Sequence, residues 1–313
     1  MGATSNSVKV DVKTTPRVRQ NMVYLLVKQL RPHQWTKNLL VFAALLFSLH
    51  KVSPDVIGKS VLAFLLFCFV SGCVYILNDF VDIKNDRNHP EKQFRPMASG
   101  ALPPALALAF GAFLLVGSLV CAYYFDRLFA LVLLVYFVLN VAYSLKLKHV
   151  VILDVMIISA GFVLRAIGGS LMIQTPFTPW FLLCTMLLAL FLAISKRRHE
   201  LILLQQDKGT HRKVLDSYSS ELLNQLNTIV TTMTIISYSL FTFTSGRTIH
   251  LMWTIPLVIF GIFRYLYLIT VTNQGGSPEK VLLQDKPILI TVLLYVLMVA
   301  GIIYAFEFKL PTV

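Results

Sequence analysis

The chain has 313 residues, of which 56% are hydrophobic and 14% are charged. Its mean hydropathy is +0.71, which is too high for a soluble domain with a polar surface. These values exclude a soluble protein, and we predict an all-α integral membrane protein.

Residues 1–20 are polar and basic. No apolar run there precedes a small-residue cleavage site, so we expect no removable signal peptide. We predict a basic, disordered cytoplasmic tail over residues 1–20 and a single transmembrane domain over residues 21–313. Residues 17–34 are expected to form an interfacial amphipathic helix that leads into Trp35.

Apolar runs recur along the rest of the chain, and a membrane span needs about 17–25 such residues, or slightly fewer with suitable flanks. We predict about nine transmembrane helices around a polar cavity that faces the cytoplasm. The predicted spans are residues 36–50, 56–77, 104–125, 128–145, 150–172, 179–194, 227–244, 251–271 and 287–306.

The basic residues fall mainly in alternate loops. With the N-terminus in the cytoplasm, the cytoplasmic loops carry most of the 28 Lys and Arg residues, as the positive-inside rule requires. We therefore predict a multi-pass protein of the inner (plasma) membrane with its C-terminus on the opposite side. The formal net charge of +13 then reflects topology and attraction to anionic lipids, and binding of nucleic acid is not expected.

The cysteines and histidines show no metal-binding spacing. The four cysteines lie in apolar runs, and we interpret them as packing residues. The seven histidines are scattered and include no i, i+4 pair on a helix with an acid, so we expect no zinc site.

The second predicted span runs into the polar sequence YILNDFVDIKNDRNHPEKQFRPMASG, residues 75–100. It contains the pattern NDxxDxxxD, formed by Asn78, Asp79, Asp82 and Asp86. If the helix runs on for two turns, this spacing brings the side chains together. Three carboxylates so close repel one another unless a cation lies among them. A solvated helix end is the alternative, but a few oxygen ligands completed by a substrate diphosphate favour a Mg²⁺ site.

This motif at the cytoplasmic end of the second of nine spans resembles that of the UbiA superfamily of intramembrane prenyltransferases, in which it binds Mg²⁺ and a substrate diphosphate. Further stretches resemble one branch, the decaprenyl-phosphate phosphoribosyltransferases, which transfer phosphoribose to a polyprenyl phosphate. The similarity covers nearly the whole chain after about residue 25. The stretches are RPHQWTKNLLVFAALLFS (31–48), HPEKQFRPMASG (89–100), YSLKLKHVVILDVMIISAGFVLRAIGG (143–169), SKRRHELILLQQDKGTHRKVLDSYS (195–219) and SPEKVLLQDKPIL (277–289).

One stretch departs from the wider superfamily. Quinone-type prenyltransferases carry a second aspartate-rich motif after the sixth span, where this chain reads SKRRHE with a single acid, Glu200. A second acidic metal site is therefore in doubt, and the cations there suit an additional phosphate. The positive-inside rule alone is the alternative explanation for each cation. The candidates on the predicted inner face are Arg31, Lys37, Arg87, Lys92, Arg95, Lys146, Lys148, Lys196, Arg197 and Arg198.

The fifth predicted span carries two charges, Asp154 and Arg165, that topology does not require. A charge near the bilayer centre costs about 2.5–3.5 kcal/mol, so Arg165 is expected to face a polar cavity or a partner. Asp154 has three alternative roles: binding metal, orienting Lys146 or Lys148, or holding the ribose hydroxyls. Arg264, in the eighth span, is ambiguous in the same way and is left outside the site.

The resemblance implies an enzyme that transfers 5-phosphoribose from phosphoribosyl pyrophosphate to a polyprenyl phosphate such as decaprenyl phosphate. Pyrophosphate is released, Mg²⁺ is the expected cofactor with Mn²⁺ as an alternative, and the product serves as an arabinose or ribose donor for the cell envelope. An oligomer is compatible with this prediction. The predicted site residues are Asn78, Asp79, Asp82 and Asp86 for the metal; Asp82, Asp86 and Asp154 for catalysis; and Lys37, Arg87, Lys92, Arg95, Tyr143, Lys146, Lys148, Arg165, Lys196, Arg197 and Glu200 for substrate.

Other functions stay open at this point. A prenyltransferase of the same superfamily would move a prenyl group from a prenyl diphosphate to an aromatic or quinone precursor, but SKRRHE argues against it. A membrane transporter would place Arg165 and Arg264 along its pathway, but the sequence lacks two matching halves with interrupted spans. A noncatalytic scaffold would leave NDxxDxxxD unexplained. Residues 196–225 are expected to form a long polar loop that is either a lid or a plain connector.

Overall fold

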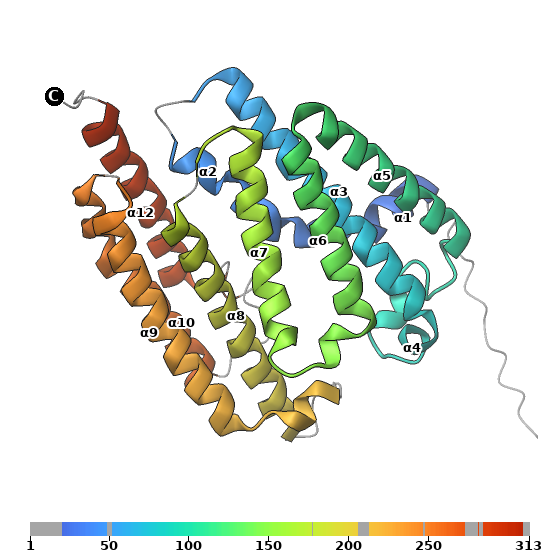
Figure 1. Cartoon of the computed structure of the whole chain (residues 1–313). Helices are drawn as coiled ribbons and strands as arrows, with labels where there is room; N and C mark the ends of the chain where they lie inside the picture. The colour runs from blue at the N-terminus through green and yellow to red at the C-terminus, as the bar shows by residue number, and fades with distance from the viewer. Residues whose placement is uncertain are drawn as a thin grey trace, which may run out of the picture.

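The computed structural model describes residues 21–48, 52–176, 178–205, 213–246, 248–272, 281 and 284–308, and this part of the chain contains helices and no β-strand (Figure 1). The predicted all-α fold is confirmed, and the predicted tail over residues 1–20 lies outside the described residues. The long helices are α3 (Pro54–Val81), α5 (Pro104–Phe125), α6 (Arg127–Leu145), α7 (Leu153–Met172), α8 (Pro179–Gln205), α9 (Ser220–Thr244), α10 (Ile255–Thr270) and α12 (Lys286–Ile303). The short ones are α1 (Met22–Gln29), α2 (Ala43–Leu46), α4 (Ile83–Arg87), the 3₁₀-helices η1 (Pro32–Phe42), η3 (Lys92–Phe94), η4 (Leu147–His149), η5 (Lys213–Ser217) and η6 (Ile249–Thr254), and the π-helix η7 (Tyr304–Phe308).

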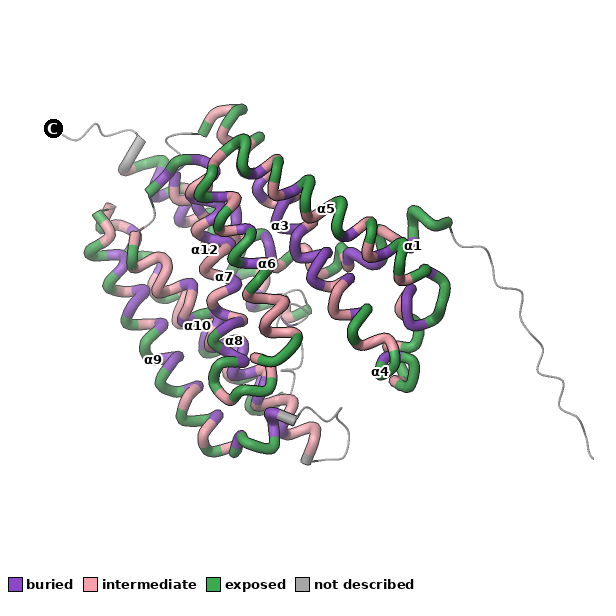
Figure 2. The backbone as a smooth tube through the Cα atoms, turned by 45° about the vertical axis from the view of Figure 1, so that its right-hand side comes forward, coloured by how far each residue is buried: buried purple, intermediate pink, exposed green. Residues whose placement is uncertain are grey.

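Eight helical segments in the described residues are long and apolar enough to cross a membrane. They correspond to the second through ninth predicted spans, and the predicted spans 104–125 and 128–145 agree with α5 and α6 to within one residue. Within an apolar stretch of 18 residues in each helix, 61% is buried in α3 and 56% in α7. The corresponding shares are 22% in α5 and 17% in α6. Figure 2 shows the same contrast between α3 and the outward faces of α5 and α6. The helices that carry Asn78 and Asp79 (α3) and Asp154 and Arg165 (α7) are therefore central, and α5 and α6 present an apolar outer face.

Polar caps mark where several of these helices begin. The Ser53 hydroxyl accepts a hydrogen bond from the Val56 N–H at 3.3 Å, and the Asp126 carboxylate accepts one from Phe129 at 2.7 Å. Pro54, like the proline at the start of α5, stands at a position where the helix needs no N–H donor. Asp126, the single residue between α5 and α6, is therefore the C-cap of α5 and the N-cap of α6.

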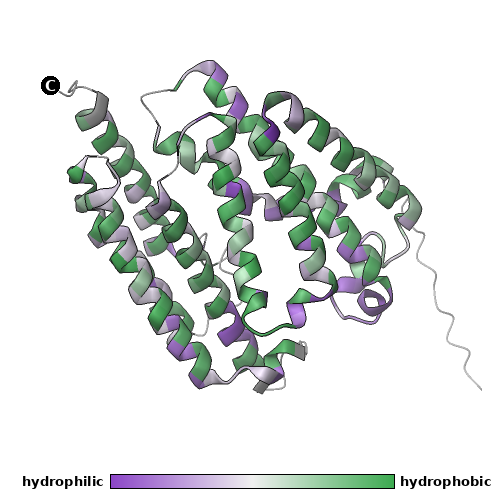
Figure 3. Ribbon diagram, in the orientation of Figure 1, coloured by the Kyte–Doolittle hydropathy of each residue, from purple (hydrophilic) through white to green (hydrophobic). Residues whose placement is uncertain are grey.

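One end of the bundle gathers the polar sequence motifs. The C-terminal ends of α3 and α8, the α6–α7 turn and the start of α9 all lie in the lower part of Figure 1 because successive long helices run in alternate directions. Figure 3 shows hydrophilic residues around α4 and at the lower ends of α8 and α9. The C-terminal end of α12 lies at the other end of the molecule.

The predicted first span, residues 36–50, does not form an α-helix of spanning length in the described residues. Residues 32–42 form η1 and residues 43–46 form α2, while residues 49 and 50 lie outside the described part. Arg31 adopts a left-handed conformation (φ 53°) before Pro32, which separates η1 from α1. Within the predicted amphipathic helix over residues 17–34, the described residues form α1 and the start of η1, and residues 17–20 lie outside the described part. The predicted number of nine spans stays a prediction.

η1 packs against α7 at a glycine. A Cβ built on Gly169 would lie 2.1 Å from the carbonyl oxygen of Val41, a backbone atom that cannot move away as a flexible side chain would. Neighbouring Gly168 leaves room for the Phe67 ring, which would lie 2.5 Å from its Cβ. The two glycines thus admit the backbone of η1 on one side and an aromatic ring of α3 on the other.

We expect Gly169→Ala to destabilise the protein by about 1–3 kcal/mol, the usual cost of overpacking. Thermal unfolding in detergent measures the effect as a lowered midpoint. Gly117→Ala is the matched control, since nothing lies within 4 Å of a Cβ at that helical position. An equal midpoint for the two variants would contradict the close approach of Val41 to Gly169.

The stretch 196–225 is mostly not a loop, so the expectation of a long polar loop was wrong. α8 continues through Gln205, η5 follows at Lys213–Ser217, and α9 begins at Ser220. The SKRRHE sequence is therefore helical. Val214 and Leu215 are each 1% exposed and pack in the core cluster that also contains Leu223, so residues 213–217 are anchored to the bundle. Residues 206–212, the other part of the proposed lid, lie outside the described residues.

Arg264 pairs with Asp285 and joins α10 to the start of α12. Its Nη2 donates to Oδ2 at 2.9 Å and its Nε donates to Oδ1 at 3.3 Å, and the same Oδ1 accepts from the Ile288 N–H at 2.9 Å. The hydrogen bonds from Arg264 hold the pKa of Asp285 below its usual value against the opposing effect of desolvation. Arg264 thus pairs with a carboxylate that joins two helices, which is consistent with leaving it outside the predicted site.

This lowered pKa predicts a pH-dependent contribution to stability. A carboxyl group whose pKa is lower in the folded state contributes fully above its unfolded pKa, about 4, and loses that contribution as the pH falls through the folded value. We expect Asp285→Asn to lower the unfolding midpoint at neutral pH, and the difference from wild type to shrink below about pH 4. Asp55→Asn is the control, because Asp55 forms an exposed i, i+4 pair with Lys59 and such pairs contribute little. A difference that stays constant down to pH 3 would refute the role of the Asp285 charge.

Candidate active site

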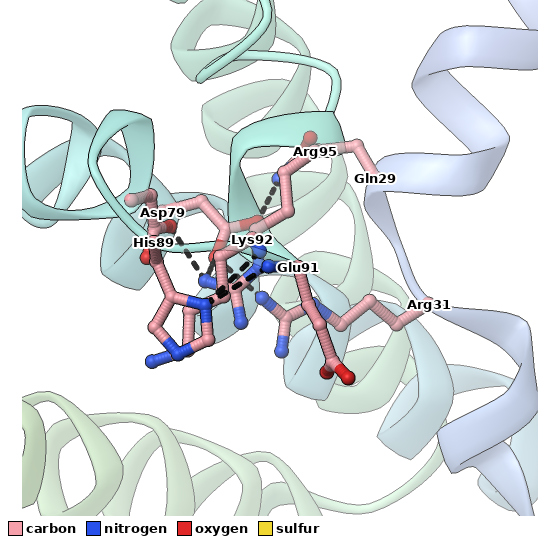
Figure 4. A network of polar contacts seen from close by, with 8 residues as sticks. Gln29, Arg31, Asp79, His89, Glu91, Lys92 and Arg95 are labelled. Atoms are coloured by element: carbon pink, nitrogen blue, oxygen red, sulfur yellow. Dashed lines mark hydrogen bonds and ion pairs between the residues drawn. The ribbon is translucent and has the colours of Figure 1, made fainter. Parts of the chain in front are cut away.

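Asp79, on the last turn of α3, is the centre of a charged cluster. Its side chain is 3% exposed. Oδ2 accepts a hydrogen bond from Gln29 Nε2 at 2.6 Å, and Oδ1 pairs with the Arg31 guanidinium and with Arg95 Nη1, the latter at 2.9 Å (Figure 4). Arg31 also lies over the Tyr75 ring, with its Cζ 4.8 Å from the centroid. Residues from α1 and the α1–η1 junction thus reach the carboxylate of a motif far along the chain.

Arg95 joins a second carboxylate to this cluster. The same Nη1 lies 2.6 Å from Oδ2 of Asp86, whose side chain is 4% exposed. His89 stabilises the loop between Asp86 and Arg95. Its Nδ1 accepts hydrogen bonds from the backbone N–H groups of Glu91 and Lys92 at 3.2 and 3.3 Å (Figure 4). One positively charged nitrogen therefore lies between two buried carboxylates.

The other two residues of the motif lie elsewhere. Asn78 and Asp82 line a small groove between the ends of α3 and α6, together with Leu77, Val81, Val141, Ser144 and Leu145. In the described part of the chain, Asp82 has no ion pair and its carboxylate accepts no hydrogen bond. It is thus the motif acid whose carboxylate stays available to a ligand.

The predicted convergence of all four residues was only partly right. The helix does run on to Arg87, with Asp82 N–H bonded to Asn78 O at 2.9 Å and Asp86 N–H to Asp82 O at 2.8 Å. It is interrupted at Asp82 (φ −93°, ψ 7°). Asp79 and Asp86 therefore converge on Arg95, whereas Asn78 and Asp82 line the groove. Among the described residues no group of three His, Cys, Asp or Glu side chains is close enough to hold a metal ion.

A second buried cluster joins α6, α7, α8 and the segment after η5. Arg197 is 2% exposed, and its Nε donates to Oδ2 of the fully buried Asp154 at 2.7 Å. Its Nη1 pairs with Glu200 Oε2 at 2.6 Å, and its Nη2 is 3.4 Å from the Tyr143 hydroxyl. The Tyr218 hydroxyl donates to the other oxygen of Asp154 at 2.7 Å. The structure brings together four predicted site residues here and adds Tyr218.

This arrangement limits what its members can do. Both oxygens of Asp154 are occupied by Arg197 and Tyr218, and no ion pair of Asp154 with a lysine is seen in the described residues. Arg197 is neutralised by two carboxylates rather than presented to a phosphate. Buried ion pairs of this kind are strongly destabilising when one partner is removed. The cluster fixes the ends of three helices relative to one another.

Arg165 lies in a third cluster, within the span of α7. It is 7% exposed; Nε donates to Asn38 Oδ1 at 2.6 Å, Nη2 to the Tyr136 hydroxyl at 2.6 Å, and Nη1 to Gly161 O at 2.8 Å. The prediction that Arg165 finds a polar partner is confirmed. Asn38 in turn donates to Cys68 Sγ at 3.2 Å, so the arginine ties η1 to α3, α6 and α7.

The remaining predicted substrate cations surround the polar end without forming one cluster. Arg87 is exposed and donates to Ala98 O at 3.2 Å. Lys146 is exposed, and the others are partly exposed: Lys37, Lys92, Lys148 and Lys196. The sequence prediction missed Gln29, Asn38 and Tyr218. The last two stand inside the stretches 31–48 and 195–219 that carry the family resemblance, which is the signal that points to them.

Comparison with known proteins shows the family of this chain. The sequence profile of the UbiA prenyltransferase family matches residues 39–283. The chain belongs to the UbiA prenyltransferase family. It is 34% identical to the decaprenyl-phosphate phosphoribosyltransferase of Mycolicibacterium smegmatis over 91% of this chain and 94% of that protein. It is 32% identical to the Corynebacterium glutamicum protein of the same name, over 91% and 88% of the two chains.

Solved structures of UbiA proteins share the fold. A UbiA homolog from Archaeoglobus fulgidus bound to DMAPP and Mg²⁺ superposes with a TM-score of 0.68 at 19% identity, covering 90% of this chain and 99% of the other. A structure described as digeranylgeranylglyceryl phosphate synthase gives a TM-score of 0.66 at 18% identity, with coverage of 90% and 98%. At these identities the likeness concerns the fold. Gln29 and Arg31, which hold Asp79, precede the part matched by the family profile.

Proposed function

We propose that this UbiA protein transfers 5-phosphoribose from phosphoribosyl pyrophosphate to a polyprenyl phosphate such as decaprenyl phosphate, with release of pyrophosphate. The observation that carries the proposal is the 34% identity, over nine-tenths of both chains, to a decaprenyl-phosphate phosphoribosyltransferase. The site supports the proposal, because the carboxylates of Asp79 and Asp86 and an excess of Lys and Arg residues lie at the same polar end of the helix bundle. A soluble donor with two anionic groups and a lipid acceptor with a third need such a site at the membrane surface.

A divalent metal, Mg²⁺ or alternatively Mn²⁺, fits the donor set of the motif. Its side chains offer oxygen ligands only, and Asp79 and Asp86 already share one positively charged nitrogen. Asn78, Asp79, Asp82 and Asp86 would hold the ion, which would require the carboxylates of Asp79 and Asp86 to exchange Arg95 for the ion. When bound, it supplies positive charge that stabilises the departing pyrophosphate.

The chain's own residues would bind and orient the anionic groups. Arg31 and Arg95 keep two guanidinium groups beside Asp79, where a diphosphate would lie. The acceptor phosphate oxygen attacks the anomeric carbon, the bond from that carbon to the pyrophosphate oxygen breaks, and inversion is expected. Because the second pKa of a phosphate monoester is about 6, the acceptor is already ionised and no strong general base is needed. Positioning then carries most of the catalysis.

The location of the site at one end of the helix bundle bears on the membrane and the orientation of the protein. The apolar helices indicate a multi-pass membrane protein. We propose the plasma membrane, with the polar end and the N-terminus in the cytoplasm, where phosphoribosyl pyrophosphate is available. The polyprenyl product would serve as a pentose donor for the cell envelope.

The experiment that tests the function uses purified protein in detergent with Mg²⁺, radiolabelled phosphoribosyl pyrophosphate and decaprenyl phosphate. Label that moves into the organic phase with wild type, and not without the lipid, supports the transfer. A parallel reaction offers a prenyl diphosphate and an aromatic acid. Alkylation of the acid without transfer of label to the lipid would replace the proposal with the prenyltransferase alternative.

A further inference from the structure

The turn between α6 and α7 contains a strained residue. Ile152, which caps α7, has φ 70° and ψ −45°. A β-branched side chain disfavours positive φ, because the Cβ crowds the backbone, and such conformations persist only where the surroundings impose them. The strain therefore calls for a partner that holds the turn.

Tyr218 is that partner. Its hydroxyl accepts a hydrogen bond from the Ile152 N–H at 2.8 Å and donates one to Asp154 Oδ1 at 2.7 Å. Tyr218 is 6% exposed. Burial, assisted by the bond to Asp154, raises the pKa of Tyr218 to about 12, so the hydroxyl keeps the proton that it donates. Arg197 fixes the other oxygen of Asp154 at 2.7 Å. The Tyr218 hydroxyl is therefore oriented by a carboxylate that is itself fixed, and it holds the α6–α7 turn through its hydrogen bond with the Ile152 N–H.

The same turn carries two basic residues, and the first of them directly follows a residue that lines the motif groove. Ser144 and Leu145, the last residues of α6, line the groove with Asn78 and Asp82. Lys146 follows directly and Lys148 lies in η4. Within the described part of the chain neither lysine has an ion pair or a side-chain hydrogen bond, so both ammonium groups remain available to an anion.

The groove walls indicate which anion. Leu77, Val81, Val141 and Leu145 form its apolar part, and Val81 and Leu145 are 58% and 56% exposed on the outer surface. An apolar wall that leads along the chain into two lysines with no anionic partner in the described residues fits a lipid phosphate better than a fully polar sugar phosphate.

We propose that Tyr218 is a positioning residue: its hydroxyl holds the strained α6–α7 turn so that Lys146 and Lys148 meet the phosphate of the polyprenyl acceptor. This inference rests on the proposed function. Tyr218 itself touches neither substrate and acts through the backbone of Ile152.

Tyr218→Phe tests the inference by removing one oxygen. We expect the KM for polyprenyl phosphate to rise about fivefold, the ratio that one hydrogen bond of typical net strength represents. The KM for phosphoribosyl pyrophosphate and kcat should stay within about twofold. Tyr295→Phe is the matched control, because its hydroxyl bonds only Tyr238 among described residues, at 3.3 Å near the far end of the bundle. It should leave both KM values unchanged.

A second substitution separates positioning from a general loss of structure. In the Tyr218→Phe background, Ile152→Gly should return the KM for polyprenyl phosphate toward the wild-type value, because glycine adopts positive φ without strain. Ile152→Ala should not, since alanine shares the steric restriction of isoleucine. Hydrogen–deuterium exchange of residues 146–152 should be faster in Tyr218→Phe than in wild type and unchanged in Tyr295→Phe.

The outcomes separate the two proposals. If wild type transfers no label to the lipid, the proposed function fails, whereas the exchange measurement still tests the grip of Tyr218 on the turn. If wild type is active and Tyr218→Phe leaves both the acceptor KM and the exchange unchanged, the inference is overturned. Equal rescue by glycine and alanine would also overturn it, because the strain at Ile152 would then play no part.

Discussion

Asp82→Asn is expected to lower the kcat of phosphoribosyl transfer by about 10²–10³-fold, the usual effect of removing one group that stabilises developing charge. Asp82 is the motif acid that has no ion pair in the described part of the chain and lines the groove. Its replacement leaves no cation without a partner, so the thermal unfolding midpoint should stay within about 2 °C of wild type. Steady-state kinetics at saturating Mg²⁺, combined with thermal unfolding in detergent, measures both quantities.

Asp79→Asn provides the contrast. Asp79 is 3% exposed and pairs with Arg31 and Arg95. The amide would leave both guanidinium groups less compensated, so activity and the unfolding midpoint should fall together. If Asp82→Asn destabilised the protein as much as Asp79→Asn, the division of the motif into a paired and a free half would be wrong. Wild-type activity in Asp82→Asn would remove Asp82 from the catalytic site.

Arg197→Met is expected to destabilise the folded protein by about 3–5 kcal/mol, the cost of breaking a buried ion pair from one side. The fully buried Asp154 would lose the Nε hydrogen bond of 2.7 Å and keep only Tyr218. Arg198→Met is the matched control on the same helix, since Arg198 is partly exposed and among the described residues bonds only neutral groups, the Asn224 side chain and the Ile269 carbonyl, and it should cost about 1 kcal/mol because no buried charge loses its partner. Thermal unfolding in detergent would report the difference.

The double variant Arg197→Met with Asp154→Leu distinguishes burial of charge from loss of packing. Removing both charges leaves no unpaired buried carboxylate, so most of the lost stability should return. Additive losses in the double variant would show that the two residues stabilise the fold independently. In that case the cluster would not act as the ion pair that the geometry indicates.

The predicted helices agree best where the apolar pattern alone decides them. Span 104–125 coincides with α5, and span 128–145 with α6. The first and sixth spans depart furthest. The first span begins in polar sequence, and its residues 36–42 belong to η1, which packs against Gly169. The sixth span continues as α8 through basic residues, because Asp154 and Glu200 neutralise Arg197. Hydropathy does not include such long-range compensation.

The sequence by itself determined that the protein is a helical membrane protein of the UbiA family, with an acidic motif and an excess of cations at one end. Residue spacing and composition carry that information, because helical periodicity and hydrophobicity are local properties. Only the tertiary structure decided which charges meet. It paired Asp79 with Gln29, Arg31 and Arg95, gave both oxygens of Asp154 to Arg197 and Tyr218, and left the Asp82 carboxylate without an ion pair among the described residues. These pairings depend on where helices distant in sequence come together, which no local pattern specifies.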